Sequence, residues 1–318
     1  MQVSVNVRAS RIVEEMIARQ DEIGVSVYKV GEGTVIDAGV EAPGGYLAGR
    51  YLTEVCLGGL GSVTMTWKQY GEMSLPVVVV STDHPSVALL GSQFAGWQIK
   101  VEKFFAMGSG PARALALKPK ELYEKIGYRD EADTAVIVLE TTQKPDEAVV
   151  EYISNACSVD SKDLYIVLAS TSSLAGSAQI SGRIVETGLH KLVDVGFDPK
   201  LVLYGSGCAP IAPVHPKFQR AMGRTNDALL YGGETFFAVR CEDDEELRRI
   251  VEQVPSSKSR DYGRSFFETF KEAGYGFYKI DPALFAPACI TVNNLKTGSV
   301  YRAGQINEKV LKESFFGH

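Results

Sequence analysis

The sequence has little of what disulfide frameworks and metal sites require. Its five cysteines stand far apart at positions 56, 157, 208, 241 and 289, without a C-x-x-C pair, and its four histidines are scattered. This spacing argues against a zinc–cysteine site and against a disulfide framework. The sequence therefore predicts a protein without a structural metal.

A surplus of positive charge is also lacking. The 318 residues include 33 lysines and arginines against 39 aspartates and glutamates, a net charge of −6. We therefore expect no nucleic-acid partner and no membrane partner. The uncharged stretch at 164–182 carries too many hydroxyl groups for a membrane span, and the first residues have no apolar secretory core. These features predict a cytoplasmic protein.

Short apolar runs alternate with helical patterns along the chain. A helix is expected at 10–20, a strand pair at 25–29 and 34–37, a valine-rich strand at 76–82, and one long helix at 174–195. The alternation predicts an α/β fold (mixed α+β) with two lobes and a substrate cleft between them. We expect a discontinuous first lobe, 1–97 plus 256–318, and a second α/β lobe at 98–255.

A glycine-rich turn at 107–113 precedes a helical pattern. Pro111 suits the first position of a helix, which leaves the following N–H groups facing an anion. The turn matches neither the dinucleotide fingerprint nor a P-loop, so an ordinary tight loop stays open as an alternative. As a ligand cradle it would use Ser109, Gly110 and Arg113.

The stretch at 169–186 runs from an apolar strand into small and hydroxyl-bearing residues. Small side chains let a ligand approach closely, so Ser177 and Gln179 are candidate binding residues. Arg183 and Glu186 are three residues apart and share one face if the segment is helical. The pair is either a solvated surface contact or a pair that faces a pocket.

A second candidate site lies at 205–210, directly after a predicted strand at 201–204. Its sequence, GSGCAP, resembles a strained turn that carries a nucleophile. A cysteine nucleophile needs a base, and His215 reaches Cys208 only if the loop folds back. A small residue lining a pocket is the simpler interpretation of Cys208.

Several longer motifs resemble the methenyltetrahydromethanopterin cyclohydrolase family over essentially the whole chain. They are GTVIDAG at 33–39, APGGY at 42–46, CLGGLG at 56–61, SAQISGRIVE at 177–186, GSGCAP at 205–210 and GRTND at 223–227. The resemblance implies a cytoplasmic homotrimer of one-carbon metabolism in methanogenic or related archaea, or in methylotrophic bacteria. It implies two α/β domains that bind a pterin between them, without metal or organic cofactor. It also implies that Arg183 and Glu186 are catalytic.

The chemistry of that family fits these residues. The N5,N10-methenyl cation of tetrahydromethanopterin is already electrophilic, and hydrolysis to the N5-formyl derivative needs a base to take a proton from water. We assign this role to Glu186, with Arg183 orienting it. Glu140, at the end of a predicted strand, is a candidate for binding the amino-pyrimidinone edge. The alternatives are a thiol-dependent acyl or amide hydrolase and a non-catalytic pterin-binding protein.

Overall fold

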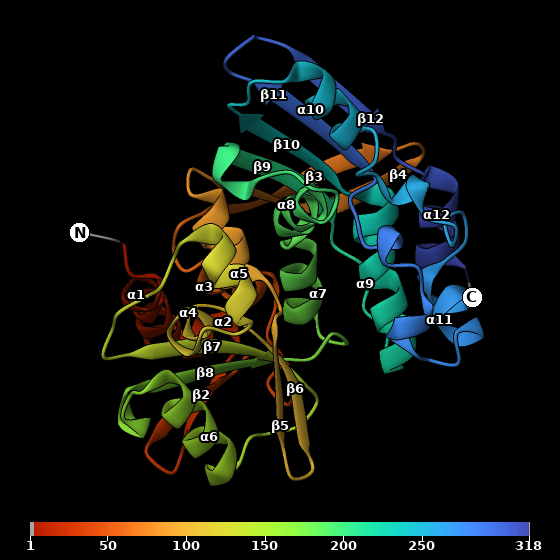
Figure 1. Ribbon diagram of the computed structural model, residues 1–318. Coiled ribbons are helices and arrows are strands. Elements are labelled where there is room, and N and C mark those ends of the chain that lie inside the picture. Colours follow the sequence, from red (N-terminus) through yellow and green to blue (C-terminus); the bar gives the residue numbers. More distant parts are fainter. Residues whose placement is uncertain (1–2, 318) are drawn as a thin grey trace. The chain divides into compact units, whose positions relative to one another are not determined.

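The computed structural model describes residues 3–317 and confirms the mixed α/β fold, with two six-stranded sheets (Figure 1). Contacts divide the chain into two compact units. The first unit comprises residues up to Ser62 together with Ser86–Gln179, and the second comprises Val63–Pro85 together with the residues from Ile180 onward.

This division differs from the predicted one, which grouped residues 256–318 with the N-terminal part of the chain. Strand pairing is the physical reason. Strand β11 (Cys289–Asn294) pairs in parallel with β10 (Glu234–Val239), and the backbone hydrogen bonds of that ladder keep the C-terminal residues in the second unit. The predicted boundary between residues 255 and 256 falls inside the second unit, where the Ser256 side chain is buried and donates to the Leu230 carbonyl at 2.5 Å.

The first unit is built on a sheet with the strand order β1-β2-β8-β7-β6-β5. The strands are β1 (Ser26–Val30), β2 (Gly33–Asp37), β5 (Trp97–Val101), β6 (Phe104–Ser109), β7 (Ala135–Glu140) and β8 (Leu164–Ala169). The three central strands, β2, β8 and β7, run parallel, and the outer pairs are antiparallel. The carboxyl ends of the central strands therefore meet at one edge of the sheet.

Helices cover both faces of this sheet, as a parallel sheet requires. They are α1 (Val5–Ala18), α2 (Gln20–Ile23), α3 (Tyr46–Cys56), α4 (Ala112–Ala116), α5 (Lys120–Ile126), α6 (Glu147–Cys157), α7 (Leu174–Ser181) and the π-helix η1 (Ser86–Gln93). Alternate residues of β7 point to opposite faces: Val136 and Val138 pack with α1 and α3, and Ile137 and Leu139 pack with α6.

Helices α3 and α7 approach each other closely because small residues face each other. A Cβ atom on Gly49 would lie 2.6 Å from the Cβ of Ala178, which is closer than side-chain atoms tolerate. The small-residue character of the segment after β8 therefore serves helix packing in part.

The second unit is built on a sheet with the strand order β12-β11-β10-β9-β4-β3. Its further elements are β3 (Ser62–Tyr70), β4 (Met73–Thr82), β9 (Val202–Pro210), β12 (Val300–Gly304), α8 (Ile184–Asp194), α9 (Phe218–Gly232), α10 (Asp244–Val251), α11 (Phe266–Glu272) and α12 (Glu308–Phe316). Residues of α9, α11 and α12 form one core with β3 and β4, and α8 packs on β9 and β10.

Two local predictions are wrong. The single helix expected at 174–195 is two helices, α7 and α8, which are interrupted at Gly182 and Arg183. The expected turn at 205–210 is part of strand β9, which pairs with β4 and β10. Its glycines serve sheet packing, since a Cβ on Gly207 would lie 2.6 Å from the Glu234 carbonyl oxygen.

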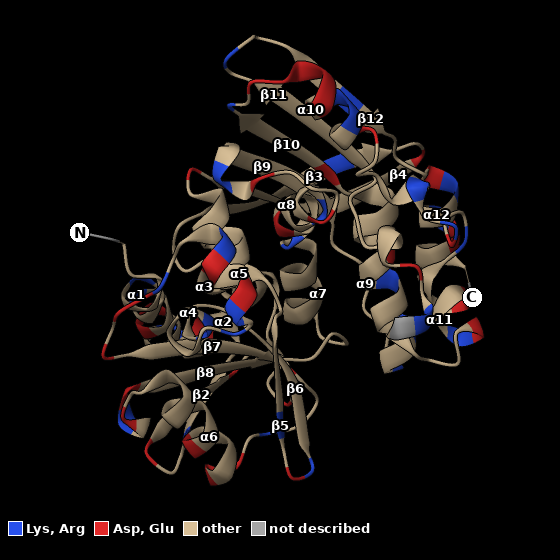
Figure 2. Ribbon diagram, in the orientation of Figure 1, with Lys and Arg blue, Asp and Glu red and all other residues tan. Residues whose placement is uncertain are grey.

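Acidic residues open the helix α10, which runs from Asp244 to Val251. Asp243 caps α10 by accepting the Glu246 N–H at 2.9 Å, and the acids lie in its first turn while arginines lie in its last (Figure 2). This order of charges complements the helix dipole. In residues 3–317, no helix is both long and apolar enough to cross a membrane.

Candidate active site

Arg183 and Glu186 form an ion pair at the start of α8. Nη2 of Arg183 lies 3.4 Å from Oε2 of Glu186, and the two side chains are only 12% and 6% exposed. The interruption of the helix creates this geometry. Arg183 is the residue before α8, its carbonyl accepts the Thr187 N–H at 2.8 Å, and Glu186 follows in the first turn.

The burial of this pair excludes the interpretation as a solvated surface contact. Removing a carboxylate and a guanidinium from water costs several kcal/mol. The attraction between the two charges does little more than offset this cost. The start of α8 adds a favourable contribution, since an acid in the first turn meets the positive end of the helix dipole. A pair that contributes so little to net stability is a candidate for chemistry.

Ser109 and Gln179 meet in the first unit, through a residue that the sequence did not single out. The Gln179 amide donates to the Cys56 thiol at 3.5 Å, and the Ser109 hydroxyl lies 3.5 Å from the same sulfur. All three are buried. Ser177 is also fully buried on α7, two residues before Gln179. No signal in the sequence could connect Cys56 to them, because the contacts join distant segments.

Gly110 and Arg113 lie in a tight turn rather than in an open cradle. Gly110 has a positive φ of 96°, and its N–H donates to the Ser92 carbonyl at 2.8 Å. Arg113 is 0% exposed. Its Nε donates to the Lys118 carbonyl at 2.8 Å, and its Nη1 donates to the carbonyls of Leu90 and Ser92 at 3.2 and 3.1 Å. A direct contact with an anionic ligand would require this side chain to leave its surroundings.

Glu140 ends β7 at the edge where the parallel strands finish. Its carboxylate accepts a hydrogen bond from the Thr171 hydroxyl, which belongs to the segment that follows β8. Glu140 is half-buried and Thr171 is 1% exposed. The structure therefore gives Glu140 a fixed neighbour that the sequence analysis missed.

Asp37 ends β2 at the same edge and was not predicted as a site residue. Its two carboxylate oxygens accept the N–H groups of Gly39, Val40, Glu41 and Ala42 at 2.7–3.1 Å. The side chain is 1% exposed, so these bonds fix the loop that follows β2. An aspartate directly before a glycine-containing turn is the signal that could have indicated this role.

The predicted binding residues of the first unit thus fall into separate groups. Ser109 lies opposite Val138 of β7, and the chain turns away at Gly110 beside Val136. Glu140 closes the other end of β7, and each residue of a strand advances the chain by about 3.3 Å. The turn at 110–113 therefore lies about 10 Å or more from Glu140 along the strand direction.

Comparison with known proteins decides the family. The model of a family described as cyclohydrolase (MCH) matches residues 4–315. A methenyltetrahydromethanopterin cyclohydrolase from Methanothermobacter marburgensis is 49% identical over 98% of this chain and 99% of its own. Proteins of that name from Methanocaldococcus jannaschii and Methanococcoides burtonii are 48% and 47% identical, each over 98% of both chains. The chain belongs to the MCH cyclohydrolase family.

In this MCH-family chain, the two residues of the alternative thiol site have different neighbours. Lys68 Nζ lies 3.7 Å from the Cys208 sulfur, and Lys68 also forms an ion pair with Glu234. The half-buried His215 accepts the Lys217 N–H at 3.0 Å through its own Nδ1. Nothing among these contacts pairs the thiol with the imidazole.

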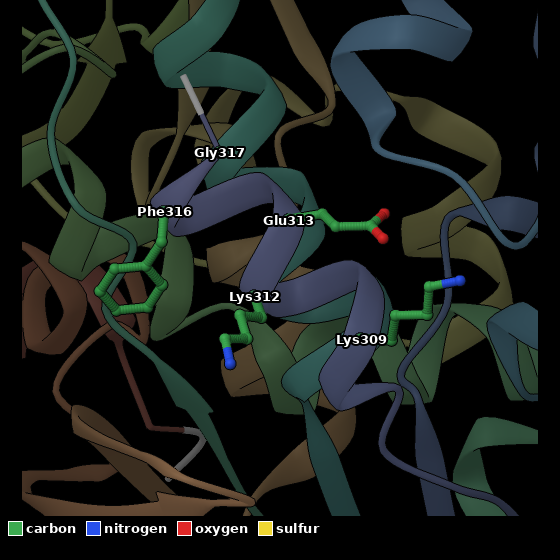
Figure 3. Close-up of a pocket in the computed structure, with 5 residues that line it drawn as sticks. All are labelled: Lys309, Lys312, Glu313, Phe316 and Gly317. Atoms are coloured by element: carbon green, nitrogen blue, oxygen red, sulfur yellow. The ribbon is translucent and has the colours of Figure 1, made fainter.

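A hollow beside α12 is lined by Lys309, Lys312, Glu313, Phe316 and Gly317. Lys309 and Glu313 point to one side of the helix while Lys312 and Phe316 point to the other, so these side chains do not converge on a ligand (Figure 3). Residues 3–317 contain no group of three or more histidine, cysteine, aspartate or glutamate side chains placed to hold a metal ion.

Proposed function

We propose that the chain reversibly hydrolyses the N5,N10-methenyl cation of tetrahydromethanopterin to N5-formyltetrahydromethanopterin. The family and the names of the relatives support this substrate. The observation that carries the proposal is the buried Arg183–Glu186 pair, in which a carboxylate is held beside a guanidinium at a helix start.

In the proposed reaction, Glu186 accepts a proton from water while the water oxygen bonds to the cationic carbon. The resulting carbinolamine loses its hydroxyl proton as the carbon–N10 bond breaks, N10 takes up a proton, and one proton is released overall. Positioned proton transfer of this kind contributes about 10²–10⁴ in rate. Arg183 orients the carboxylate and stabilises the oxygen as its charge develops.

We propose that the reaction needs neither a metal nor an organic cofactor. The physical reason is the positive charge of the substrate carbon, which already attracts water, so that no Lewis acid has to polarise it. Exhaustive dialysis against a chelator tests this point. Turnover should be unchanged afterwards, and a loss that is restored by added metal would contradict it.

The predicted binding residues keep distinct proposed roles. Glu140 accepts the N–H donors of the amino-pyrimidinone edge, and Ser109, Gly110, Ser177 and Gln179 support the pterin site within the first unit. Because the Arg113 guanidinium is buried among carbonyl groups, its proposed role changes from direct contact with an anionic tail to support of the turn that carries Ser109 and Gly110.

We further propose a cytoplasmic homotrimer that serves one-carbon metabolism, as the family resemblance implies. Sedimentation equilibrium tests the assembly, because a trimer has three times the chain mass of 34.6 kDa. A mass equal to one or two chains would contradict the trimer while leaving the proposed reaction standing.

The ultraviolet absorbance of the methenyl cation tests the function directly, since its conjugation is lost on hydrolysis. We expect the purified chain to accelerate that loss and Glu186→Gln to lower kcat by at least about 10²-fold without loss of fold. Glu54→Gln is the matched control, because Glu54 also pairs with an arginine, Arg50, at 3.3 Å on a helix. It should leave kcat within twofold.

Two outcomes would overturn the proposal. Near-normal turnover in Glu186→Gln would remove this carboxylate from the mechanism. Tight binding of the methenyl cation by the wild-type chain without any loss of absorbance would favour the non-catalytic pterin-binding protein.

A further inference from the structure

The segments that follow three strands of the first sheet lie at the same edge of that sheet. Strands β2, β8 and β7 are parallel neighbours, with Asp37 opposite Leu168 and Glu140 opposite Ala169. Ligands of such sheets bind outside the carboxyl ends of the strands. The segments at this edge are the loop after Asp37, the hydroxyl-rich run at 170–173 and the residues after Glu140.

This edge is held rigid by side chains that bond to its own backbone. Asp37 accepts four N–H groups of the loop that follows it. The Ser173 hydroxyl donates to the Ser170 carbonyl at 2.7 Å and accepts the Gly176 N–H at 3.0 Å. The side chains of Asp37 and Ser173 are thus bonded to the backbone. The Glu140 carboxylate is bonded to a side chain instead.

Glu140 has a hydrogen bond to a side-chain hydroxyl and, among the described residues, no ion pair with a protein cation. Within residues 3–317 no lysine, arginine or histidine lies within 4.0 Å of its carboxylate. A half-buried carboxylate is stabilised by hydrogen-bond donors. The adjacent N–H and amino groups of an amino-pyrimidinone offer two donors side by side, which match the two oxygens of a carboxylate.

We propose that Thr171 is a positioning residue for Glu140, and that its hydroxyl fixes the carboxylate in the orientation that accepts the paired N–H donors of the pterin. This inference rests on the proposed function and names the interaction that recognises the pterin ring. Thr171 is almost fully buried on the segment after β8, so its hydroxyl acts on the ligand through Glu140.

The physical basis is preorganisation. A glutamate side chain that is free to rotate loses rotamer entropy when it binds, and this loss weakens binding. The hydrogen bond from Thr171 restricts that freedom before the ligand arrives. Removing the hydroxyl should therefore weaken substrate binding and leave the chemical step unchanged.

The test compares Thr171→Val, which keeps the shape and removes the hydroxyl, with Thr171→Ser, which keeps the hydroxyl. We expect Thr171→Val to raise KM for the methenyl cation about 3–10-fold with kcat within twofold, and Thr171→Ser to restore KM to within twofold of wild type. Thr134→Val is the matched control, since the Thr134 hydroxyl also donates to a backbone carbonyl, that of Asp163 at 3.0 Å, but lies just before the opposite end of β7. It should leave KM unchanged.

A double-mutant cycle with Glu140→Gln separates positioning from a purely structural role. We expect Glu140→Gln to raise KM by itself and Thr171→Val to add almost nothing in that background. An unchanged KM in Thr171→Val, or the same rise with and without Glu140, would overturn the inference. If Thr171→Val does not fold, Thr171→Ala replaces it in the same cycle.

These results also distinguish the inference from the proposed function. If the wild-type chain does not consume the methenyl cation, the proposed function fails. If it consumes the cation and Thr171→Val has a normal KM, only the role of Thr171 fails.

Discussion

Two buried arginines, one in each unit, stand at the start of short helical segments and do different things. The Arg113 guanidinium is 0% exposed, donates to three backbone carbonyls and lies 5.2 Å from the centre of the Phe94 ring. The Arg183 side chain is 12% exposed and faces the carboxylate of Glu186. Both follow a glycine-containing turn, so their sequences look alike.

The difference lies in what each guanidinium meets. Carbonyl groups of two segments, η1 and the residues after α4, surround Arg113, so this cation joins backbone segments that have no ladder between them. Arg183 meets an ionisable group that can exchange a proton with water. The kind of acceptor therefore separates an arginine that supports the fold from one that supports a reaction, and burial alone does not.

The largest effect that would test this comparison is on stability. Arg113→Met leaves the carbonyls of Leu90, Ser92 and Lys118 without this partner, and each unsatisfied buried carbonyl costs about 1–3 kcal/mol. We expect the free energy of unfolding in urea to fall by about 3–5 kcal/mol, with kcat of the folded fraction within twofold.

The exposed Arg11 supplies the control, since Arg11→Met should change stability by less than about 0.5 kcal/mol. A stable Arg113→Met with a raised KM would reverse the assignment and return Arg113 to direct contact with the ligand.

The next effect is on activity. Arg183→Met removes the group that steadies Glu186 and stabilises charge on oxygen, and loss of such a donor lowers kcat by about 10²–10³-fold. We expect this loss with a Tm within a few degrees of wild type, measured by absorbance turnover and thermal melting. If kcat persists while Tm collapses, Arg183 is structural like Arg113 and the comparison fails.

The sequence predicted most elements of the sheets because their signals are local. The apolar runs of β2 and β4 are examples, and both follow from neighbouring residues alone. The pairing of the C-terminal strands with β10 was not predicted, because pairing joins residues far apart in the sequence. The interruption at Gly182 and Arg183 was also missed, although a glycine is a common local signal for the end of a helix.

In the candidate site, too, local sequence predicted some features, and others depend on contacts between distant segments. The spacing of Arg183 and Glu186 indicated that they could meet, and the resemblance gave them roles. The roles of Thr171, Cys56 and Asp37 came only with the structure, because each depends on a contact between a side chain and a distant segment or on a loop conformation. The burial of Arg113 corrected the prediction that it contacts a ligand directly. The sequence around Arg113 indicates a turn but does not indicate which carbonyls surround the guanidinium.

A third buried charge, Asp227 of α9, extends the comparison to a carboxylate. It is 0% exposed and accepts the Phe266 N–H at 2.8 Å, which ties α9 to the start of α11. Burial raises the pKa of Asp227 to about 7, with a smaller raising effect from Glu268, against the lowering effect of hydrogen bonds from Ser314 and Phe266. Arg224 lies one turn earlier on α9 and donates to the Ser314 carbonyl.

The sign of the pH dependence follows from this raised pKa. Between about pH 4, where an unfolded aspartate loses its proton, and pH 7, the folded state holds a proton that the unfolded state has released. Stability attributable to Asp227 is therefore fully present below pH 4 and is lost as the pH rises towards 7. Asp227→Asn cannot titrate and still offers an oxygen to the Phe266 N–H.

We expect Asp227→Asn to be more stable than wild type at pH 8 by about 1–3 kcal/mol, and to match it more closely at pH 5. Urea unfolding at both pH values measures the difference. Equal stability gaps at the two pH values would show that Asp227 does not titrate in this window.

The smallest expected effect belongs to Cys208. Its contact is with Lys68 on the sheet of the second unit, and the Arg183–Glu186 mechanism makes no use of a thiol. Cys208→Ser keeps a small polar side chain beside the lysine, so kcat and KM should stay within twofold and alkylation of the remaining thiols should not change this result. If instead Cys208→Ser abolishes turnover while the Tm is kept, the reaction requires the Cys208 thiol. The proposed contrast between a structural Arg113 and a catalytic Arg183 would then no longer explain catalysis.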